Sequence, residues 1–451
     1  MVFIMPKLSW KTESSWKSAD NKKVFAFAEA YKKFLSECKT EREVVAWTVT
    51  AAKKKGFKRY DNAPKPGKRY YFTSGEKAVA LVIIGRRKKE LRISAAHADS
   101  PRIDLKPRPV TEDSDLALFK GHYYGGIKKY QWVNHPLALH GVIFKEDGSR
   151  VDVKMGEKEG EPVFVVPDLL PHLAKKQMEK KAAEVIEGEA LAVIAGGTPA
   201  DSKEDKFKNT VLDVLHKKYG VKEEDLASAE LELVPASKPA DVGIDKSMIM
   251  AYGQDDRSSC YTSIQALFQA PKIPENTLAV FLFDREEIGS VGLGGASTNF
   301  LENVFMKIYG LETARSLLEN SRILSADVTA GVNPLYKEAY DMSNATYLGR
   351  GVAVAKYTGS GGKSGSSEAP AEYMAWVRKI LNKNKVPWQT GELGKVDLGG
   401  GGTVALFLAK QGASVVDIGV CLLSMHSPAE VSSKVDIYNM YRAVSAFFKE
   451  K

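Results

Sequence analysis

The chain is poor in cysteine. Its 451 residues include three, Cys38, Cys260 and Cys421, which stand far apart and form no Cys-x-x-Cys pair. This spacing argues against a disulfide framework and against a structural zinc ribbon, and it is compatible with a reducing compartment. We therefore expect a cytoplasmic protein whose fold does not depend on disulfides.

Long apolar runs are also missing. The N-terminal apolar stretch Val2–Met5 ends at Pro6 and is too short for the core of a signal peptide. No other run reaches the length that crosses a bilayer. The sequence therefore predicts a soluble protein with no membrane partner.

Acidic residues are fewer than basic ones, with 56 Asp and Glu against 65 Lys and Arg and a formal net charge of +9. A lysine-rich solvated surface explains such an excess, because net charge governs solubility and association rather than fold. The sharper interpretations are nucleic-acid binding and an acidic substrate. No basic motif interleaved with aromatic residues occurs, so we expect no nucleic-acid partner.

Two catalytic signatures are absent. No Gly-x-Ser-x-Gly elbow occurs, so a serine hydrolase is unsupported. The stretch Gly359–Ser364 imitates a phosphate-binding loop, but Tyr357 stands where that pattern requires glycine. The glycine run Gly399–Gly402 lacks dinucleotide-binding spacing, although such a loop lets the backbone approach a substrate closely.

Strand and helix patterns alternate at both ends of the chain, which is an α/β layout. Between them, from about 105 to 167, short strand-like pieces separated by glycines suggest a small barrel or sandwich. A chain of 451 residues also exceeds what one hydrophobic core usually serves. We therefore predict a discontinuous catalytic domain of residues 1–106 and 243–451, interrupted by an inserted β-rich, barrel-like domain of residues 107–242.

The sequence does contain histidines and carboxylates that each follow a strand-like run. They are His97 and Asp99, Asp255 and Asp256, Glu286 and Glu287, Asp327, and His426. In open α/β sheets, ligands bind beyond the carboxyl ends of the strands. Imidazole and carboxylate together suit zinc or a similar divalent metal. We therefore predict a metal-dependent hydrolase with two metal ions.

Two of these pairs have ordinary alternatives. His97 and Asp99 could be a surface pair, but alternation at a strand end puts both side chains on one side. Asp99 can then hold one ring nitrogen of His97 while the other binds metal. Asp255 and Asp256 could form a solvated turn, but adjacent carboxylates repel each other unless a cation neutralises them.

The pair Glu286 and Glu287 is the strongest single motif, although two glutamates also often begin a helix. In a metal site, one glutamate can bind metal. The other can take a proton from a water whose pKa the metal lowers to about 7. A bridging aspartate, with one histidine and one carboxylate for each metal, completes a co-catalytic site, and the five motifs provide that count.

These motifs resemble those of the aspartyl aminopeptidases, dinuclear metallo-aminopeptidases that form large tetrahedral assemblies. The matching stretches are Ser94–Pro101, Tyr124–Gly126, Trp132, Pro136–Gly141, Asp255–Cys260, Asp284–Ser290, Ser325–Asp327 and Ser424–Ser427. The similarity covers nearly the whole chain. It implies a zinc-peptidase-like α/β/α catalytic domain and an inserted domain that serves oligomerisation. It also implies hydrolysis of N-terminal residues, acidic ones among them, from peptides.

The resemblance implies a role for each residue of the set. The metal ligands would be His97 and Asp327 for one ion, Glu287 and His426 for the other, and Asp255 between them. Glu286 would be the general base, and Asp99 would orient His97. The two ions would be zinc, with cobalt or manganese as alternatives.

The resemblance also implies contacts with substrate. His172 matches a histidine that enters a neighbouring subunit's active site, and Lys356 matches a substrate-contacting lysine. The active species would then be a homo-oligomer, with dimers assembled into a tetrahedral dodecamer.

Two positions depart from the family pattern around the substrate: Asp168 and Ala330 stand where histidines are usual. They bear on the preference for an acidic N-terminal residue and not on the metals. Two alternatives stay open at this point. One is another dinuclear amidohydrolase, such as a deacylase, and the other is a peptide-binding scaffold without activity.

Overall fold

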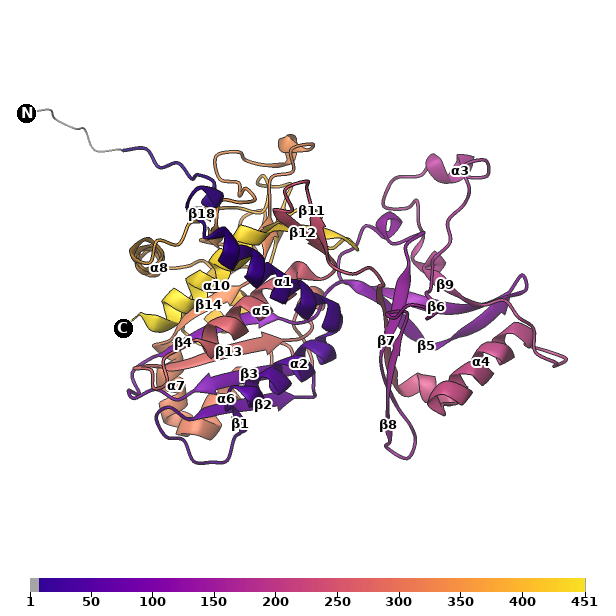
Figure 1. The fold of residues 1–451 in the computed structure, drawn as a ribbon, viewed down its shortest axis with the longest axis horizontal. Helices are drawn as coiled ribbons and strands as arrows, with labels where there is room; N and C mark the ends of the chain where they lie inside the picture. Colours follow the sequence, from indigo (N-terminus) through magenta and orange to yellow (C-terminus); the bar gives the residue numbers. More distant parts are fainter. Residues whose placement is uncertain (1–7, 451) are drawn as a thin grey trace, which may run out of the picture.

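A nine-stranded mixed sheet forms the centre of the larger of two lobes (Figure 1). The structure, a computed structural model, describes residues 8–450. In spatial order the strands are β1 (Lys58–Arg59), β2 (Arg69–Ser74), β3 (Ala78–Ile83), β13 (Thr277–Phe283), β4 (Leu91–His97), β14 (Arg322–Ala326), β20 (Ser414–Gly419), β16 (Val352–Ala355) and β18 (Trp388–Thr390).

The central strands of this sheet are parallel. β4 pairs in parallel with β13 on one side and with β14 on the other, and β14 pairs in parallel with β20. The carboxyl ends of these four strands therefore meet at one edge of the sheet, where α/β folds place their ligand sites.

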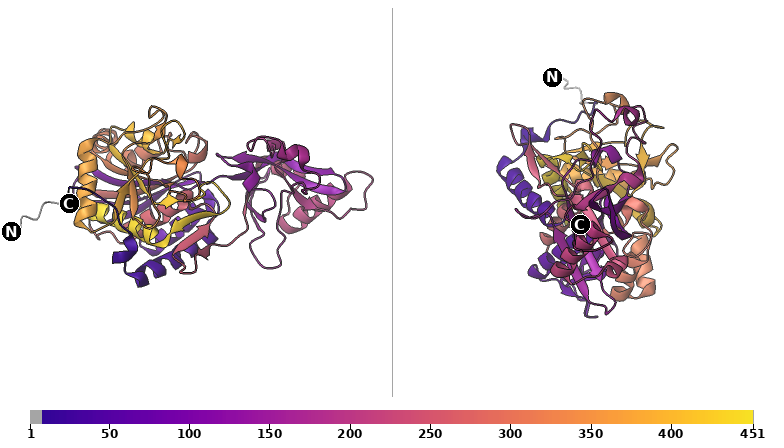
Figure 2. Two further views of the ribbon diagram at one scale, coloured as in Figure 1. Left: turned by 90° about the horizontal axis from the view of Figure 1, so that it is seen from above. Right: turned by 90° about the vertical axis from the view of Figure 1, so that its right-hand side faces the viewer.

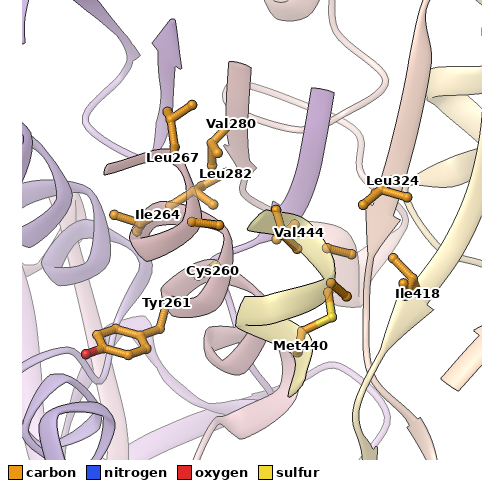
Figure 3. Close-up of a cluster of buried hydrophobic side chains, with 14 of the residues drawn as sticks. Cys260, Tyr261, Ile264, Leu267, Val280, Leu282, Leu324, Ile418, Met440 and Val444 are labelled. Carbon is orange, nitrogen blue, oxygen red and sulfur yellow. The ribbon is translucent and has the colours of Figure 1, made fainter. Parts of the chain in front are cut away.

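Helices cover both faces of the sheet. One face is covered by α1 (Asn21–Glu37), α2 (Glu41–Lys54), α5 (Gln254–Phe268), α8 (Ala371–Lys383) and α10 (Lys434–Lys449), and the other by α6 (Phe300–Tyr309), α7 (Leu311–Glu319) and α9 (Ala405–Ala409). Alternate residues of β13 enter the two cores: Val280 and Leu282 pack on the α5 side, and Phe281 packs on the α6 side. Figure 3 shows the first core, with α5 and α10 against the sheet. The predicted α/β/α arrangement is confirmed.

The smaller lobe is built on a six-stranded antiparallel sheet that projects to one side (Figures 1 and 2). Its strands, in spatial order, are β8 (Arg150–Met155), β7 (Leu137–Phe144), β10 (Ala229–Pro235), β5 (Arg102–Asp113), β6 (Leu116–Tyr124) and β9 (Ala192–Gly196). Helix α4 (Lys206–Tyr219) packs Val211 and Leu215 into the core of this lobe, and α3 (Lys175–Met178) lies at its periphery. The domain boundary expected at residue 107 falls inside β5, and the division into domains stays a prediction.

Local signals account for several helix ends. Helices α1 and α2 follow each other closely, and α2 begins at a capping box. There, Glu43 N–H donates to Thr40 Oγ1 and Thr40 N–H donates to the Glu43 carboxylate, both at 3.3 Å. Helices α6 and α7 are separated by Gly310, whose φ of 81° ends α6.

Small sheets join the loops around the larger lobe. They pair β11 (Ala240–Val242) with β12 (Met248–Ala251) and β22 (Glu430–Ser433), β15 (Thr329–Ala330) with β21 (Cys421–Leu422), and β17 (Gly359–Ser360) with β19 (Gly400–Gly401). Within residues 8–450, no helix is long and apolar enough to cross a membrane. The stretch Val2–Met5 lies outside the described residues.

Candidate metal centre

The strand ends bring the predicted residues to one place. His97 is the last residue of β4, and Asp327 directly follows β14. Glu286 and Glu287 lie in a short 3-10 turn, Glu286–Ile288, just beyond β13. With Asp255 near the start of α5 and His426 in the loop after β21, these residues line one cavity.

Asp255 lies between the two histidines. Its Oδ1 is 3.2 Å from His97 Nε2, and its Oδ2 is 3.1 Å from His426 Nε2. One carboxylate therefore presents a different oxygen to each imidazole, as a residue that bridges two metal ions must do.

Each histidine also faces a second carboxylate. Asp327 Oδ1 is 3.9 Å from His97 Nε2, and Glu287 Oε1 is 3.4 Å from His426 Nε2. Glu286 Oε2 lies 4.0 Å from His97 Nε2. The five predicted ligands thus divide into two groups that share Asp255, with Glu286 beside the first group.

Asp256 is a further candidate that the predicted ligand set omits. Oxygens of Asp256 and Asp327 lie with a ring nitrogen of His97 within 4.8 Å of one another, as do ligand atoms of His97, Asp255 and Glu287. Asp256 is fully buried, and its Oδ2 accepts the His97 N–H at 3.4 Å. The other oxygen, Oδ1, has no hydrogen-bond partner among residues 8–450. Sequence order alone does not tell which of two adjacent aspartates faces the site.

The carboxylates of the cluster repel one another, and bound cations would neutralise them. The imidazoles of His97 and His426 are surrounded by six carboxylates, those of Asp99, Asp255, Asp256, Glu286, Glu287 and Asp327. Burial, together with the neighbouring carboxylates, raises the pKa of Asp256, Glu287 and Asp327 well above the usual range. Divalent cations would remove this repulsion and hold the carboxylates ionised.

Two buried carboxylate oxygens that lack a hydrogen-bond partner among the described residues are also consistent with metal binding. Glu287 Oε1, like Asp256 Oδ1, is buried and accepts no hydrogen bond within the described part of the chain. Native structures rarely leave buried polar atoms unpaired, and an ion is one explanation. Oxygen and imidazole ligands of this kind suit zinc.

Hydrogen bonds at the far nitrogens orient both histidines. Nδ1 of His97 lies 3.1 Å from the Asp99 carbonyl oxygen, and Nδ1 of His426 lies 2.8 Å from the Gly126 carbonyl oxygen. A carbonyl oxygen can only accept, so each Nδ1 carries the proton. In the neutral tautomer each Nε2 is then unprotonated and directed at the carboxylates, as metal binding requires.

Asp99 does more than the predicted orientation of His97. Its Oδ1 lies 3.4 Å from His97 Nδ1 and accepts the Glu286 N–H at 3.2 Å. Its Oδ2 accepts the Glu287 N–H at 3.2 Å and the Tyr124 hydroxyl at 2.9 Å. One buried carboxylate thus links the end of β4 to the glutamate turn.

Sequence reasoning missed Glu430, a fully buried residue of β22. Its Oε1 accepts the His426 N–H at 2.8 Å, and its Oε2 accepts the Asp255 N–H at 3.1 Å. It therefore ties the backbone of Asp255 to that of His426. No local pattern distinguishes this glutamate from a surface residue.

A cavity of about 500 Å³ opens onto the cluster. Two glycine-rich loops, Gly359–Gly365 and Gly399–Gly402, contribute to its wall and pair with each other through β17 and β19. The stretch that imitates a phosphate loop is therefore part of this wall. Both loops bring backbone close to the space a substrate would fill.

The two predicted substrate residues lie elsewhere. Lys356 is half-exposed, and its Nζ is 3.4 Å from Glu368 Oε1. His172 is exposed in the smaller lobe, beside α3. Neither is among the described residues that line the cavity of their own subunit. Lys363 and Lys395 do line it.

The fold and this set of side chains are typical of a metal-dependent hydrolase. The model of one family, the aminopeptidase I zinc metalloproteases (M18), matches residues 34–448. The probable M18 family aminopeptidase 1 of Borrelia garinii subsp. bavariensis is 46% identical over 457 residues, which cover 98% of this chain and 100% of that protein. The chain therefore belongs to the M18 family and is an aminopeptidase of the zinc metalloprotease class.

Comparison with solved structures supports the same family and fold. The crystal structure of the M18-family aminopeptidase from Thermotoga maritima has a TM-score of 0.95 at 42% identity and covers 98% of this chain and 100% of its own. The mApe1 protein of S. cerevisiae, solved as a dodecamer, has a TM-score of 0.75 at 22% identity, with 94% of this chain and 96% of that chain covered. The latter comparison supports the fold alone.

The geometry predicts unequal roles for the adjacent aspartates. Asp255→Asn removes one of the two charged oxygens that face the two histidines, so the zinc-to-protein ratio should fall by about half or more. Asp256→Asn should lower that ratio less. Elemental analysis after dialysis against buffered zinc measures both variants, with the wild type as reference. An equal loss of zinc from both would mean that Asp256 is also a ligand.

Proposed function

We propose that this aminopeptidase holds two zinc ions per subunit and removes acidic N-terminal residues from peptides. The observation that carries the proposal is Asp255, whose two carboxylate oxygens face different histidines. His97 and Asp327 would hold one ion, and Glu287 and His426 the other. Cobalt or manganese could replace zinc in the same set of ligands.

Zinc ions bound here would polarise the scissile carbonyl and lower the pKa of a water ligand. Glu286 lines the cavity beside His97, and its N–H is held by Asp99. Its carboxylate is therefore placed to accept a proton from the attacking water and to return that proton to the leaving amine. A group needed only for proton transfer must not be consumed in metal binding, and Glu286 is the farther of the two glutamates from the His426 group.

Basic side chains at the cavity support a preference for acidic N-terminal residues. Lys363 is already paired with Glu368 at 3.2 Å. Lys395 lines the cavity and forms no ion pair within residues 8–450. A substrate carboxylate could therefore meet a free ammonium group there. This is the observation that favours acidic residues over apolar ones.

The smaller lobe supports assembly into an oligomer. Leu169, Leu170, Leu173 and Met178 surround His172 in sequence and are 52%, 50%, 67% and 74% exposed. Exposed apolar clusters of this kind mark surfaces that contact other chains. In such an assembly His172 would enter the neighbouring subunit's cavity and contact the peptide.

Glu286→Gln keeps the shape of the side chain but removes its ability to accept a proton. We expect kcat on a peptide or aminoacyl substrate to fall by about 10²–10⁴-fold, the usual effect of losing a general base. The zinc-to-protein ratio should not change, because Glu286 is not a ligand in this proposal. A variant that lost zinc but kept its turnover per bound zinc would reverse the roles of Glu286 and Glu287.

A panel of aminoacyl chromogenic substrates tests the substrate preference. With zinc added, kcat/KM should be highest for Asp and Glu, and Lys395→Ala should lower those two values about two- to fivefold, as expected for an exposed ion pair. Its effect on Leu and Ala substrates should be negligible. Lys379→Ala, an exposed lysine of α8, is the matched control. A maximum on Leu or Ala that is indifferent to Lys395 would contradict the acidic preference.

His172→Ala should lower kcat/KM on peptides while leaving the zinc content unchanged, because a group supplied by a neighbour positions substrate and not metal. Misplacement of substrate by about 1 Å can cost about 10²-fold in rate. His122→Ala, another exposed histidine of the smaller lobe, is the control. Sedimentation and dilution assays accompany the measurement, and a fully active monomer would contradict a role for His172 between subunits.

A further inference from the structure

The chain segment that follows strand β6 leaves the smaller lobe and enters the metal centre of the same subunit. β6 belongs to the six-stranded sheet and ends at Tyr124. The next two residues, Gly125 and Gly126, continue into the cluster. Gly126 lines the cavity, and its carbonyl oxygen accepts the Nδ1–H of His426 at 2.8 Å.

Gly125 shows how closely this segment approaches. Its φ is +76°, and a Cβ at this position would lie 3.2 Å from Glu287 Oε2 and 3.3 Å from Glu287 Cβ. Glycine is therefore required both by the backbone conformation and by the space beside a proposed ligand. The smaller lobe thus contacts one group of proposed ligands directly.

Tyr124 contacts the other group through Asp99. Its hydroxyl donates to Asp99 Oδ2 at 2.9 Å, and Asp99 is fully buried. The same carboxylate receives the N–H groups of Glu286 and Glu287, both at 3.2 Å. Tyr124 is not one of the described residues that line the cavity, so it does not touch substrate there.

We propose that Tyr124 is a positioning residue: its hydroxyl holds Asp99 in the orientation that places the Glu286–Glu287 turn against His97. The smaller lobe thereby serves the chemistry of its own subunit, in addition to any contact with a neighbour. This proposal rests on the proposed function, since the turn carries the general base and one metal ligand. Without the hydroxyl, Asp99 Oδ2 retains the Glu287 N–H but loses the donor that comes from the smaller lobe.

The ring of Tyr124 is held independently of its hydroxyl. The Arg102 guanidinium carbon lies 3.8 Å from the ring centroid. Arg102 is itself fixed by Asp104 at 2.7 Å and by Glu232 at 3.3 Å. Tyr124→Phe should therefore keep the ring in place and remove one hydrogen bond, so the variant should fold.

The experiment compares Tyr124→Phe with Tyr123→Phe in the full-length, zinc-loaded enzyme. Tyr123 is the neighbouring residue of the same strand and is 42% exposed. Tyr124→Phe should lower kcat about 10-fold, the lower end of the usual cost of losing an outer partner in a metal site, because Tyr124 reaches the proposed ligands only through Asp99. KM should change less than about twofold, because the walls that hold substrate are untouched. Tyr123→Phe should behave as the wild type.

A double-mutant cycle with Asp99→Ala distinguishes positioning from a merely structural role. If Tyr124 acts through Asp99, Tyr124→Phe should have little further effect on kcat in the Asp99→Ala background. Equal effects in both backgrounds, or wild-type kcat in Tyr124→Phe, would overturn the proposal. Each variant is assayed well below its own thermal midpoint, so that a loss of stability does not enter the comparison.

The rate of zinc release to a chelator separates this proposal from the proposed function. Tyr124→Phe should also release zinc faster to a chelator than Tyr123→Phe does. If the wild type shows no preference for Asp and Glu substrates, the proposed substrate preference fails, and zinc release still tests Tyr124. If the wild type is active and both tyrosine variants match it in kcat and zinc release, only the role of Tyr124 fails.

Discussion

Repulsion among carboxylates is the constraint on which the site depends. Six acidic side chains gather around two imidazoles, and burial raises the pKa of three of them well above the usual range. Such a cluster is costly unless cations balance it. The unpaired oxygens of Asp256 and Glu287 show that the protein's own donors do not satisfy it within the described residues. Bound zinc would supply both the missing charge and the missing partners.

Several separate elements of the fold together position the carboxylates and histidines of the site. Parallel strands β13, β4 and β14 deliver the glutamate turn, His97 and Asp327 to one sheet edge. Asp99 and Glu430, neither of which carries a proposed metal contact, bind the backbone of residues that do. The smaller lobe completes the arrangement through Gly126 and Tyr124. The smaller lobe therefore contributes to the geometry of the site in its own subunit.

Part of this arrangement could be predicted from the sequence. Apolar runs typical of buried strands precede His97, the Glu286–Glu287 pair and Asp327. Parallel strands bring their carboxyl ends together at one sheet edge, whatever their distance along the chain. The capping box at Thr40 is an equally local pattern, and it begins α2. The family was also recognisable from its motifs, and comparison confirms the M18 family but not the aspartyl subtype.

The remaining features depend on contacts between distant segments. The Gly126 carbonyl meets His426 across 300 positions, and Glu430 reaches back 175 positions to Asp255. The smaller sheet places β10 between β7 and β5, an order that turn signals do not encode. The choice between Asp255 and Asp256 is a matter of side-chain direction at the start of α5, which residue type does not determine.

The most direct measurement is anomalous diffraction at the zinc edge from crystals grown with zinc. The proposed centre predicts two peaks per subunit that share Asp255 as a ligand, one also bound by His97 and Asp327 and the other by Glu287 and His426. A single peak, or two peaks bridged by Asp256 with Asp255 outside the coordination sphere, would contradict the proposed dinuclear centre.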